Sequence, residues 1–240
     1  MKLKSILILG ILILAYLFFS YNRFYNFIGE KNLKIPNTQR AYTVGQSGQS
    51  LKYISLGDSL TAGVGNTDLN NTYVYQFAQK LSQQGNQIDV ENLAQPNATT
   101  IDLIKNQLPY TIDKKPDFIT ILIGINDLHG KSTTTDFYKN YDNIMQNLQS
   151  KTSAKIILLN LPYLGSSGLV YPPYNYLLDF RTKQFNGIIS SIASKYNAKL
   201  IYLYENTYEK FQNDQDLYSQ DLFHPSDKGY LLWSQIINAN

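Results

Sequence analysis

Hydrophobic and polar positions along residues 51–240 form a pattern that favours strands and helices in alternation. Short apolar runs with no polar face are typical of buried parallel strands, and apolar residues three and four positions apart are typical of amphipathic helices. Strands are expected at 51–56, 88–93, 118–123, 155–160 and 200–204. Helices are expected at 72–84, 100–108, 134–150, 177–197 and 227–238, the second of them ending before Pro109. This alternation predicts one α/β domain with a mostly parallel, five-stranded sheet.

The first 21 residues have a different pattern. Lys2 and Lys4 precede an unbroken apolar run at residues 6–19, and a basic start before an apolar segment is typical of an export signal. Bulky aromatic residues follow the run where a small-residue cleavage site would lie, so we expect residues 1–21 to remain as a membrane anchor. A cleaved signal is the alternative. The domain is expected outside the cytoplasm in both cases, at the cell membrane or secreted.

Residues 22–50 are rich in Asn, Gln, Gly and Ser, which is typical of a flexible tether, and the folded domain is expected at 51–240. Residues 1–40 contain six of the 21 basic and one of the 18 acidic residues, so the remainder of the chain is slightly acidic. A nucleic-acid partner is therefore not expected. The chain has no cysteine, which excludes disulfides, thiolate metal sites and a cysteine nucleophile.

Polar residues with catalytic potential follow several of the predicted strands. Ligands of parallel α/β sheets bind beyond the carboxyl ends of the strands. The first strand leads into Gly57-Asp58-Ser59-Leu60 and the third into Gly124-Ile125-Asn126-Asp127, while Asp221-Leu222-Phe223-His224-Pro225 follows the last strand. These segments are therefore expected to meet at one edge of the sheet.

The residue types in these segments suit nucleophilic catalysis. Ser59 lies between a strand and a helix, where a hydroxyl stands clear of the sheet, but serine is a poor nucleophile until a base accepts its proton. The unperturbed pKa of histidine is near neutral pH, so His224 is the candidate base. Asp221 precedes it by three residues and is expected to orient the imidazole.

Together the three segments resemble the SGNH, or GDSL-type, hydrolases, a family of serine esterases and lipases with a flavodoxin-like, three-layer α/β/α fold. The resemblance covers about residues 51–238. It implies an esterase with Ser59 as nucleophile, His224 as general base and Asp221 as its orienting carboxylate. It also implies that neither a metal nor an organic cofactor takes part.

The resemblance further implies an oxyanion hole formed by the backbone N–H of Ser59, the backbone N–H of Asn97 and the side-chain amide of Asn126. Asn97 stands where the family usually has glycine. Asparagine tolerates a positive φ better than other non-glycine residues, so its N–H can still point at the oxyanion.

Three further residues are candidates for substrate binding, each with a structural alternative. Asp58 is otherwise a turn or helix-cap residue, Asp127 a loop brace and Tyr163 part of a packed loop. The expected partners are the membrane, through the N-terminal segment, and an ester substrate: a small molecule, a lipid or an acylated polysaccharide. His129 is interpreted as a local polar residue.

Two functions from other classes remain as alternatives. The first is a metal-dependent phosphoesterase, although two-metal sites usually need more histidines than the two in this chain. Its candidate ligands are Asp58, Asn126, Asp127, His129, Asp221 and His224. The second is a tethered carbohydrate- or lipid-binding module on a catalytically inactive hydrolase fold. Resistance to chelators and labelling of Ser59 by a fluorophosphonate distinguish these alternatives from the esterase.

Overall fold

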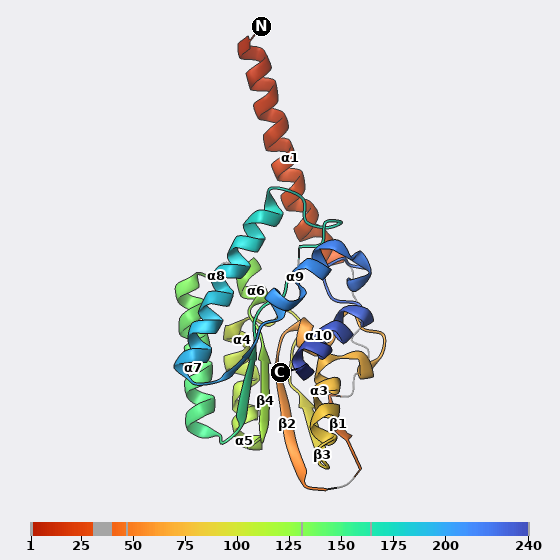
Figure 1. The fold of residues 1–240 in the computed structure, drawn as a ribbon. Helices are drawn as coiled ribbons and strands as arrows, with labels where there is room; N and C mark the ends of the chain where they lie inside the picture. The colour runs from red at the N-terminus through yellow and green to blue at the C-terminus, as the bar shows by residue number, and fades with distance from the viewer. Residues whose placement is uncertain (1, 31–39, 47, 131, 164, 240) are drawn as a thin grey trace.

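The computed structural model describes residues 2–30, 40–46, 48–130, 132–163 and 165–239. Helices and strands alternate through the domain, after one long N-terminal helix (Figure 1). The strands are β1 (Ala41–Val44), β2 (Ser50–Gly57), β3 (Gln87–Asn92), β4 (Phe118–Leu122), β5 (Lys155–Leu159) and β6 (Lys199–Ile201). The α-helices are α1 (Lys2–Glu30), α2 (Ser59–Ala62), α3 (Tyr73–Ser82), α4 (Thr100–Asn106), α5 (Leu108–Lys114), α6 (Ile125–His129), α7 (Thr134–Lys151), α8 (Tyr174–Lys195), α9 (Leu203–Asn213) and α10 (Asp227–Ala239). Two short 3-10 helices lie at Leu69–Asn71 and Gln215–Leu217.

The strands form one sheet in the order β1-β3-β2-β4-β5-β6. Strands β2 to β6 pair in parallel, and β1 pairs with β3 in the antiparallel direction. Helices α4, α5, α7 and α8 cover one face of the sheet, while α3 and α10 cover the other (Figure 1). The three-layer α/β/α architecture predicted from the sequence is therefore confirmed.

The sheet has six strands, so the prediction of five was wrong. The additional strand, β1, falls within residues 22–50, for which the sequence predicts a tether. It is a four-residue edge strand that pairs over Ala41–Val44 with Ile88–Glu91. Residues 31–39, the middle of the expected tether, lie outside the described residues.

Two helices also differ from the expected pattern. The helix expected at 100–108 ends before Pro109, at Asn106, and a second helix, α5, begins at Leu108, with Pro109 in its first turn, where the missing N–H costs no hydrogen bond. Residues 203 and 204, expected at the end of the last strand, begin α9 instead. The buried positions Leu203, Tyr204, Thr207 and Phe211 have helical spacing, and this places an amphipathic helix where a polar connection was expected.

The core is built from the apolar residues of β2, β4 and β5 and the inward faces of the helices that cover them. Ile54, Leu56, Ile119 and Ile121 are completely buried, as expected for parallel strands covered on both faces. The strands β2 and β4 end side by side, with Gly57 opposite Leu122. This register brings the loops after the two strands to the same edge of the sheet.

Candidate active site

Ser59 begins the short helix α2, two residues after the end of β2. The carboxylate of Asp58 caps this helix by accepting a hydrogen bond of 3.0 Å from the N–H of Leu60. Gly57 makes the preceding turn possible, because a Cβ at this position would overlap the carbonyl oxygen of Leu122. The serine is therefore held at a strand-to-helix turn, and only 7% of it is exposed.

A compact loop before α10 holds the acid and the histidine. The N–H of Ser219 donates to the carbonyl oxygen of His224 at 2.7 Å, which closes the loop. Oδ1 of Asp221 accepts hydrogen bonds from the hydroxyl of Ser219 at 2.7 Å and from the N–H groups of Phe223 and His224, both at 2.9 Å. Leu222, in between, adopts a positive φ of 58°. Asp221 thus organises the loop that carries the imidazole.

His224 lies between Asp221 and Ser59, and its ring joins the two in one chain of hydrogen bonds. Its Nδ1 lies 2.5 Å from Oδ2 of Asp221, and its Nε2 lies 2.9 Å from Oγ of Ser59. Burial acts to raise the pKa of Asp221, but the hydrogen bond and charge of His224, together with the hydrogen bonds from Ser219 and the N–H of Phe223, outweigh it, so the net pKa is lowered. The acid therefore remains ionised beside the ring.

Two of the residues expected to bind an oxyanion are Asn97, on the loop after β3, and Asn126, in the first turn of α6. Asn97 adopts the left-handed backbone conformation, with φ of 65°. The amide Nδ2 of Asn126 donates to the carbonyl oxygen of Ala98 at 3.0 Å, which joins α6 to the loop that carries Asn97. Gly124, before α6, has φ of 128°, and a Cβ there would lie 2.7 Å from the ring of Phe137. Backbone freedom and close packing at Gly124 thus position Asn126.

The three substrate-binding candidates have structural contacts. Asp58 is completely buried, and burial raises its pKa to about 7. Asp127, also completely buried, accepts hydrogen bonds from the N–H of Thr100 at 2.8 Å and from its hydroxyl at 2.6 Å, which braces α6 against α4. The hydroxyl of Tyr163 donates to the carbonyl oxygen of Gly165 at 2.8 Å within its own loop. These contacts favour the structural interpretation of all three side chains.

The rings of His129 and His224 both lie next to the ring of Phe223. The His129 ring lies 5.7 Å from that of Phe223, and the His224 ring lies 5.0 Å from it. Burial and the nearby charge of Arg181 lower the pKa of His129 to about 3, so this imidazole is neutral. Within the described parts of the chain, no group of three or more His, Asp or Glu side chains is arranged to hold a metal ion.

One residue that supports the site has no motif in the sequence. Gln107 is completely buried, and its side-chain amide pairs with both backbone polar groups of Gly57. Its Oε1 accepts from the N–H at 3.0 Å, and its Nε2 donates to the carbonyl oxygen at 2.8 Å. Gln107 therefore fixes the end of β2 just before Ser59. A lone glutamine between two helices carries no sequence signal for this role.

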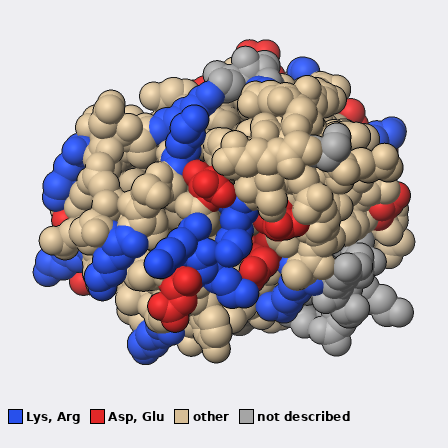
Figure 2. All heavy atoms as spheres, turned by 90° about the horizontal axis from the view of Figure 1, so that it is seen from below, with Lys and Arg blue, Asp and Glu red and all other residues tan. Residues whose placement is uncertain are grey.

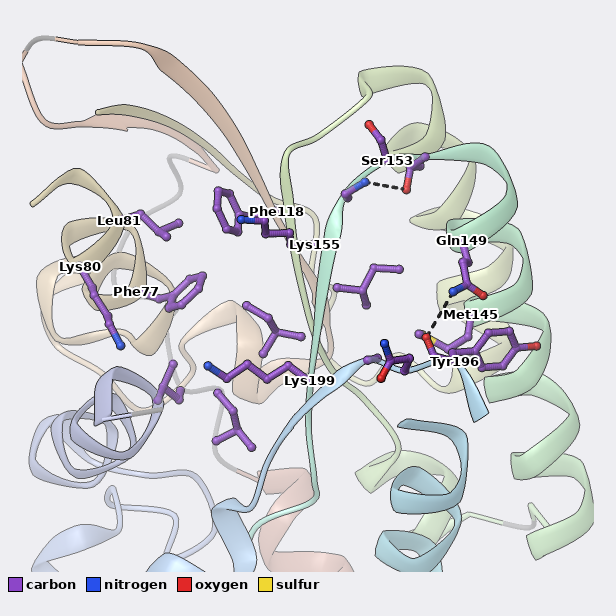
Figure 3. A pocket seen from close by; sticks show the side chains of 18 of the residues that line it. Phe77, Lys80, Leu81, Phe118, Met145, Gln149, Ser153, Lys155, Tyr196 and Lys199 are labelled. Atoms are coloured by element: carbon purple, nitrogen blue, oxygen red, sulfur yellow. Dashed lines mark hydrogen bonds between the residues drawn. The ribbon is translucent and has the colours of Figure 1, made fainter. Parts of the chain in front are cut away.

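A hollow of about 650 Å³ lies at the opposite end of the sheet, around the starts of β4, β5 and β6 (Figure 3). Phe118, Lys155 and Lys199 from these strands line it together with Phe77 and Lys80 of α3. The face seen from below Figure 1 is rich in Lys and Arg side chains (Figure 2). This end of the molecule is basic, and the hollow includes neither Ser59 nor His224.

Comparisons with known proteins agree with this fold. The spore germination lipase LipC of Bacillus licheniformis is 26% identical over 212 residues, which cover 79% of this chain and 96% of LipC. A crystal structure of a lipase/acylhydrolase from Enterococcus faecalis superposes with a TM-score of 0.64 at 25% identity and covers 79% of this chain and 94% of that one. The acetylxylan esterase Axe2 of Geobacillus stearothermophilus shares the fold, with a TM-score of 0.62 at 20% identity over 79% of this chain and 93% of its own.

The family model of the GDSL-like lipases and acylhydrolases matches residues 55–232. The match begins within β2, ahead of Ser59, and ends within α10, beyond His224. It therefore includes all the segments that meet at the edge of the sheet. The chain belongs to the GDSL-like lipase/acylhydrolase family and is an ester hydrolase of the GDSL type.

Proposed function

We propose that this protein hydrolyses carboxylic esters through a covalent acyl-enzyme on Ser59, at the outer face of a membrane. The observation that carries the proposal is the hydrogen-bonded chain from Asp221 through His224 to Ser59, with distances of 2.5 Å and 2.9 Å. Ser59 and His224 are 165 positions apart in the sequence, so local turn formation does not account for their contact. A buried serine, imidazole and carboxylate in this order form the arrangement that activates a hydroxyl.

In the proposed reaction, Nε2 of His224 accepts the proton of Ser59 as its Oγ attacks the ester carbonyl carbon. The N–H groups of Ser59 and Asn97 and the amide of Asn126 donate to the oxyanion that develops. An amide nitrogen has two N–H groups, so Asn126 can donate to Ala98 and to the substrate together. His224 then returns the proton to the leaving alcohol. Water attacks the acyl-enzyme by the same route and releases the acid.

The proposed location rests on α1. Residues Lys4–Phe24 form a helical segment of 21 residues that is apolar and long enough to cross a bilayer, and it is almost wholly exposed. A secretory signal satisfies the same criteria, and in that case the enzyme is released after cleavage. The basic start before the apolar run supports a domain outside the cytoplasm in both cases.

Mutagenesis of the hydrogen-bonded chain tests the mechanism. Ser59→Ala and His224→Ala are expected to lower kcat for a short p-nitrophenyl ester by at least about a thousandfold, and Asp221→Ala by less. A fluorophosphonate should label the wild type at Ser59 and should not label Ser59→Ala. Ser55→Ala, at a buried serine in the preceding strand β2, is the matched control and should keep its activity. Full turnover by Ser59→Ala would overturn the proposal.

Asn126→Ala tests the oxyanion hole separately. Loss of one such donor typically lowers kcat by about a hundredfold to a thousandfold, with a small effect on KM, because the contact forms mainly in the transition state. An effect confined to KM would contradict this role. His129→Ala should have a mild effect on turnover, and complete loss of activity would mean that the wrong histidine is assigned as base.

The two alternatives have different outcomes in the same assays. A metal-dependent phosphoesterase would lose activity with a chelator and would hydrolyse phosphate esters without labelling at Ser59. A binding module would retain its ligand but show neither turnover nor a fluorophosphonate adduct. The proposed esterase keeps its activity in the chelator and forms the adduct.

A further inference from the structure

The end of α1 is packed into the domain beside the candidate active site. Phe24 is completely buried, with ring centroids of Tyr174, His129 and Phe223 at 5.5, 4.8 and 6.2 Å. Because Phe223 precedes His224 and contacts its ring, only one aromatic side chain separates α1 from the catalytic imidazole. The apolar helix is therefore attached directly at the active-site end of the sheet, ahead of residues 31–39.

Hydrogen bonds hold the same part of α1 against the loop before α8. The hydroxyl of Ser20 donates to the carbonyl oxygen of Tyr171 at 3.0 Å, and Nη2 of Arg23 donates to that of Gly168 at 2.7 Å. The Arg23 guanidinium also lies 4.8 Å from the centre of the Tyr171 ring. Polar side chains and one aromatic ring thus fix the angle at which the helix leaves the domain (Figure 1).

No polar spacer separates the apolar segment from the domain. The exposed apolar side chains of α1 continue from Ile6 to Phe19 and Tyr21, while Ser20 already contacts the domain. The candidate span Lys4–Phe24 is 21 residues long, or about 31 Å at the rise of an α-helix. Its last five residues, from Ser20 on, already pack against the domain, so the other 16 of its 21 residues, or about 24 Å, are free to cross a hydrocarbon core of about 30 Å. With the span in a bilayer, the surrounding end of the domain must touch the lipid surface.

That end of the domain carries exposed apolar side chains of its own. Tyr176, Leu177 and Phe180, on the first two turns of α8, are 69%, 50% and 59% exposed. They follow Tyr174, whose ring contacts Tyr21 and Phe24 of α1, so they form an apolar rim next to the helix. Aromatic and leucine side chains in this setting are typical of membrane interfaces. The opposite end is rich in Lys and Arg, which suits exposure to water (Figure 2).

The geometry points to a bilayer-facing active site whose substrate is an ester bond of a membrane-resident lipid. This inference rests on the proposed esterase function and adds the substrate class. The rim of Tyr176, Leu177 and Phe180 lies in the lipid headgroup region beside α1. The sheet edge that carries Ser59 and His224 lies at the same end of the molecule, so a lipid acyl ester reaches Ser59 without leaving the membrane surface. Binding of an acylated polysaccharide would not require this apolar rim.

Contact of the rim with the membrane can be tested without an activity assay. The chain has one tryptophan, Trp233, which is completely buried. We would introduce Phe180→Trp into the full chain and reconstitute it in phosphatidylcholine vesicles with a dibrominated acyl chain. Tyr110→Trp is the matched control, at a 63% exposed position on α5 near the opposite end. Strong quenching at position 180 and none at position 110 is expected, and equal quenching at both positions would overturn the contact.

The substrate class is tested with the double variant Leu177→Ser/Phe180→Ser in the same vesicles. Removal of two inserted apolar side chains should lower hydrolysis of a vesicle-borne phospholipid or lysophospholipid ester by about tenfold or more. Hydrolysis of water-soluble p-nitrophenyl butyrate should not change, and Tyr110→Ser should match the wild type in both assays. A double variant with full lipid activity, or a wild type that cleaves soluble or acetylated-sugar esters but no vesicle lipid, would overturn the inference. A wild type inactive on every ester would overturn the proposed function itself.

Discussion

At the scale of single residues, the structure brings together the three polar segments that the sequence singles out. Ser59, His224 and Asp221 are connected by hydrogen bonds, as their positions after buried strands and the short spacing of Asp221 and His224 suggest. Their catalytic roles stay predictions. Gln107 could not be found in this way, because its function depends on a long-range contact with Gly57. Such contacts leave no periodic pattern in a sequence.

Gln107→Leu tests whether this buried amide positions the nucleophile. The variant leaves the N–H of Gly57 without its acceptor in a buried site, which typically costs about 1–3 kcal/mol of unfolding free energy. Because Gly57 leads directly into Ser59, kcat should fall more than KM rises. Chemical denaturation and steady-state kinetics measure the two effects. Gln83→Leu, at an exposed glutamine after α3, should change neither, and unchanged kcat in Gln107→Leu would contradict a positioning role.

At the scale of helices and strands, the sequence predicts elements where one pattern dominates. The runs in β4 and β5 are almost wholly apolar, and the second half of β2 is buried on both faces, so they are recognised as parallel strands. The strand β1 is four residues long, lies at an edge and is followed by a Gly- and Ser-rich segment, which favours a tether instead. Helix α9 begins within an apolar run that also suits a strand. For both β1 and the start of α9, tertiary contacts determine the secondary structure, and the local sequence pattern does not.

The contact between α4 and α6 gives a prediction at this scale. Thr100→Val keeps the shape of the side chain but removes the hydroxyl that donates to Asp127 at 2.6 Å. A buried carboxylate that loses one donor should destabilise the protein by about 1–3 kcal/mol. Because α6 also carries Asn126, kcat should fall as well. Thr207→Val is the matched control, since this buried hydroxyl donates only to the carbonyl oxygen of Leu203 in its own helix. If kcat is the same in both variants, the hydrogen bond between Thr100 and Asp127 contributes to stability but not to catalysis.

At the scale of the whole molecule, the attachment of α1 differs most from what the sequence suggests. An apolar run followed by a Gly-, Asn- and Ser-rich segment indicates an anchor joined to a free domain, and the pattern holds no information on docking. In the structure, the end of α1 contacts residues more than 100 positions away. Ser20 donates to Tyr171, Arg23 donates to Gly168, and Phe24 packs against His129 and Phe223. The N-terminal helix and the GDSL domain therefore share one buried interface (Figure 1).

His129 lies in this interface, and its lowered pKa predicts how the stability of the folded protein changes with pH. The folded protein keeps this imidazole neutral down to about pH 3, because burial and Arg181 lower its pKa, whereas the unfolded chain binds a proton near pH 6.5. Between these values the unfolded state binds more protons, so the free energy of unfolding should fall as the pH drops below about 6.5. The slope approaches about 1.4 kcal/mol per pH unit.

His129→Gln removes the titrating group while keeping a polar side chain of similar size next to Phe24 and Phe223. The unfolding of the full chain in detergent can be measured by guanidinium titration at intervals from pH 7.5 to pH 4. As the pH falls, the variant should therefore lose less unfolding free energy than the wild type. The difference from the wild type should grow steadily below about pH 6.5, because only the wild-type unfolded state gains this proton. Parallel stability curves for the two proteins would mean that His129 is protonated in the folded state, and that the interface between α1 and the domain admits a charge.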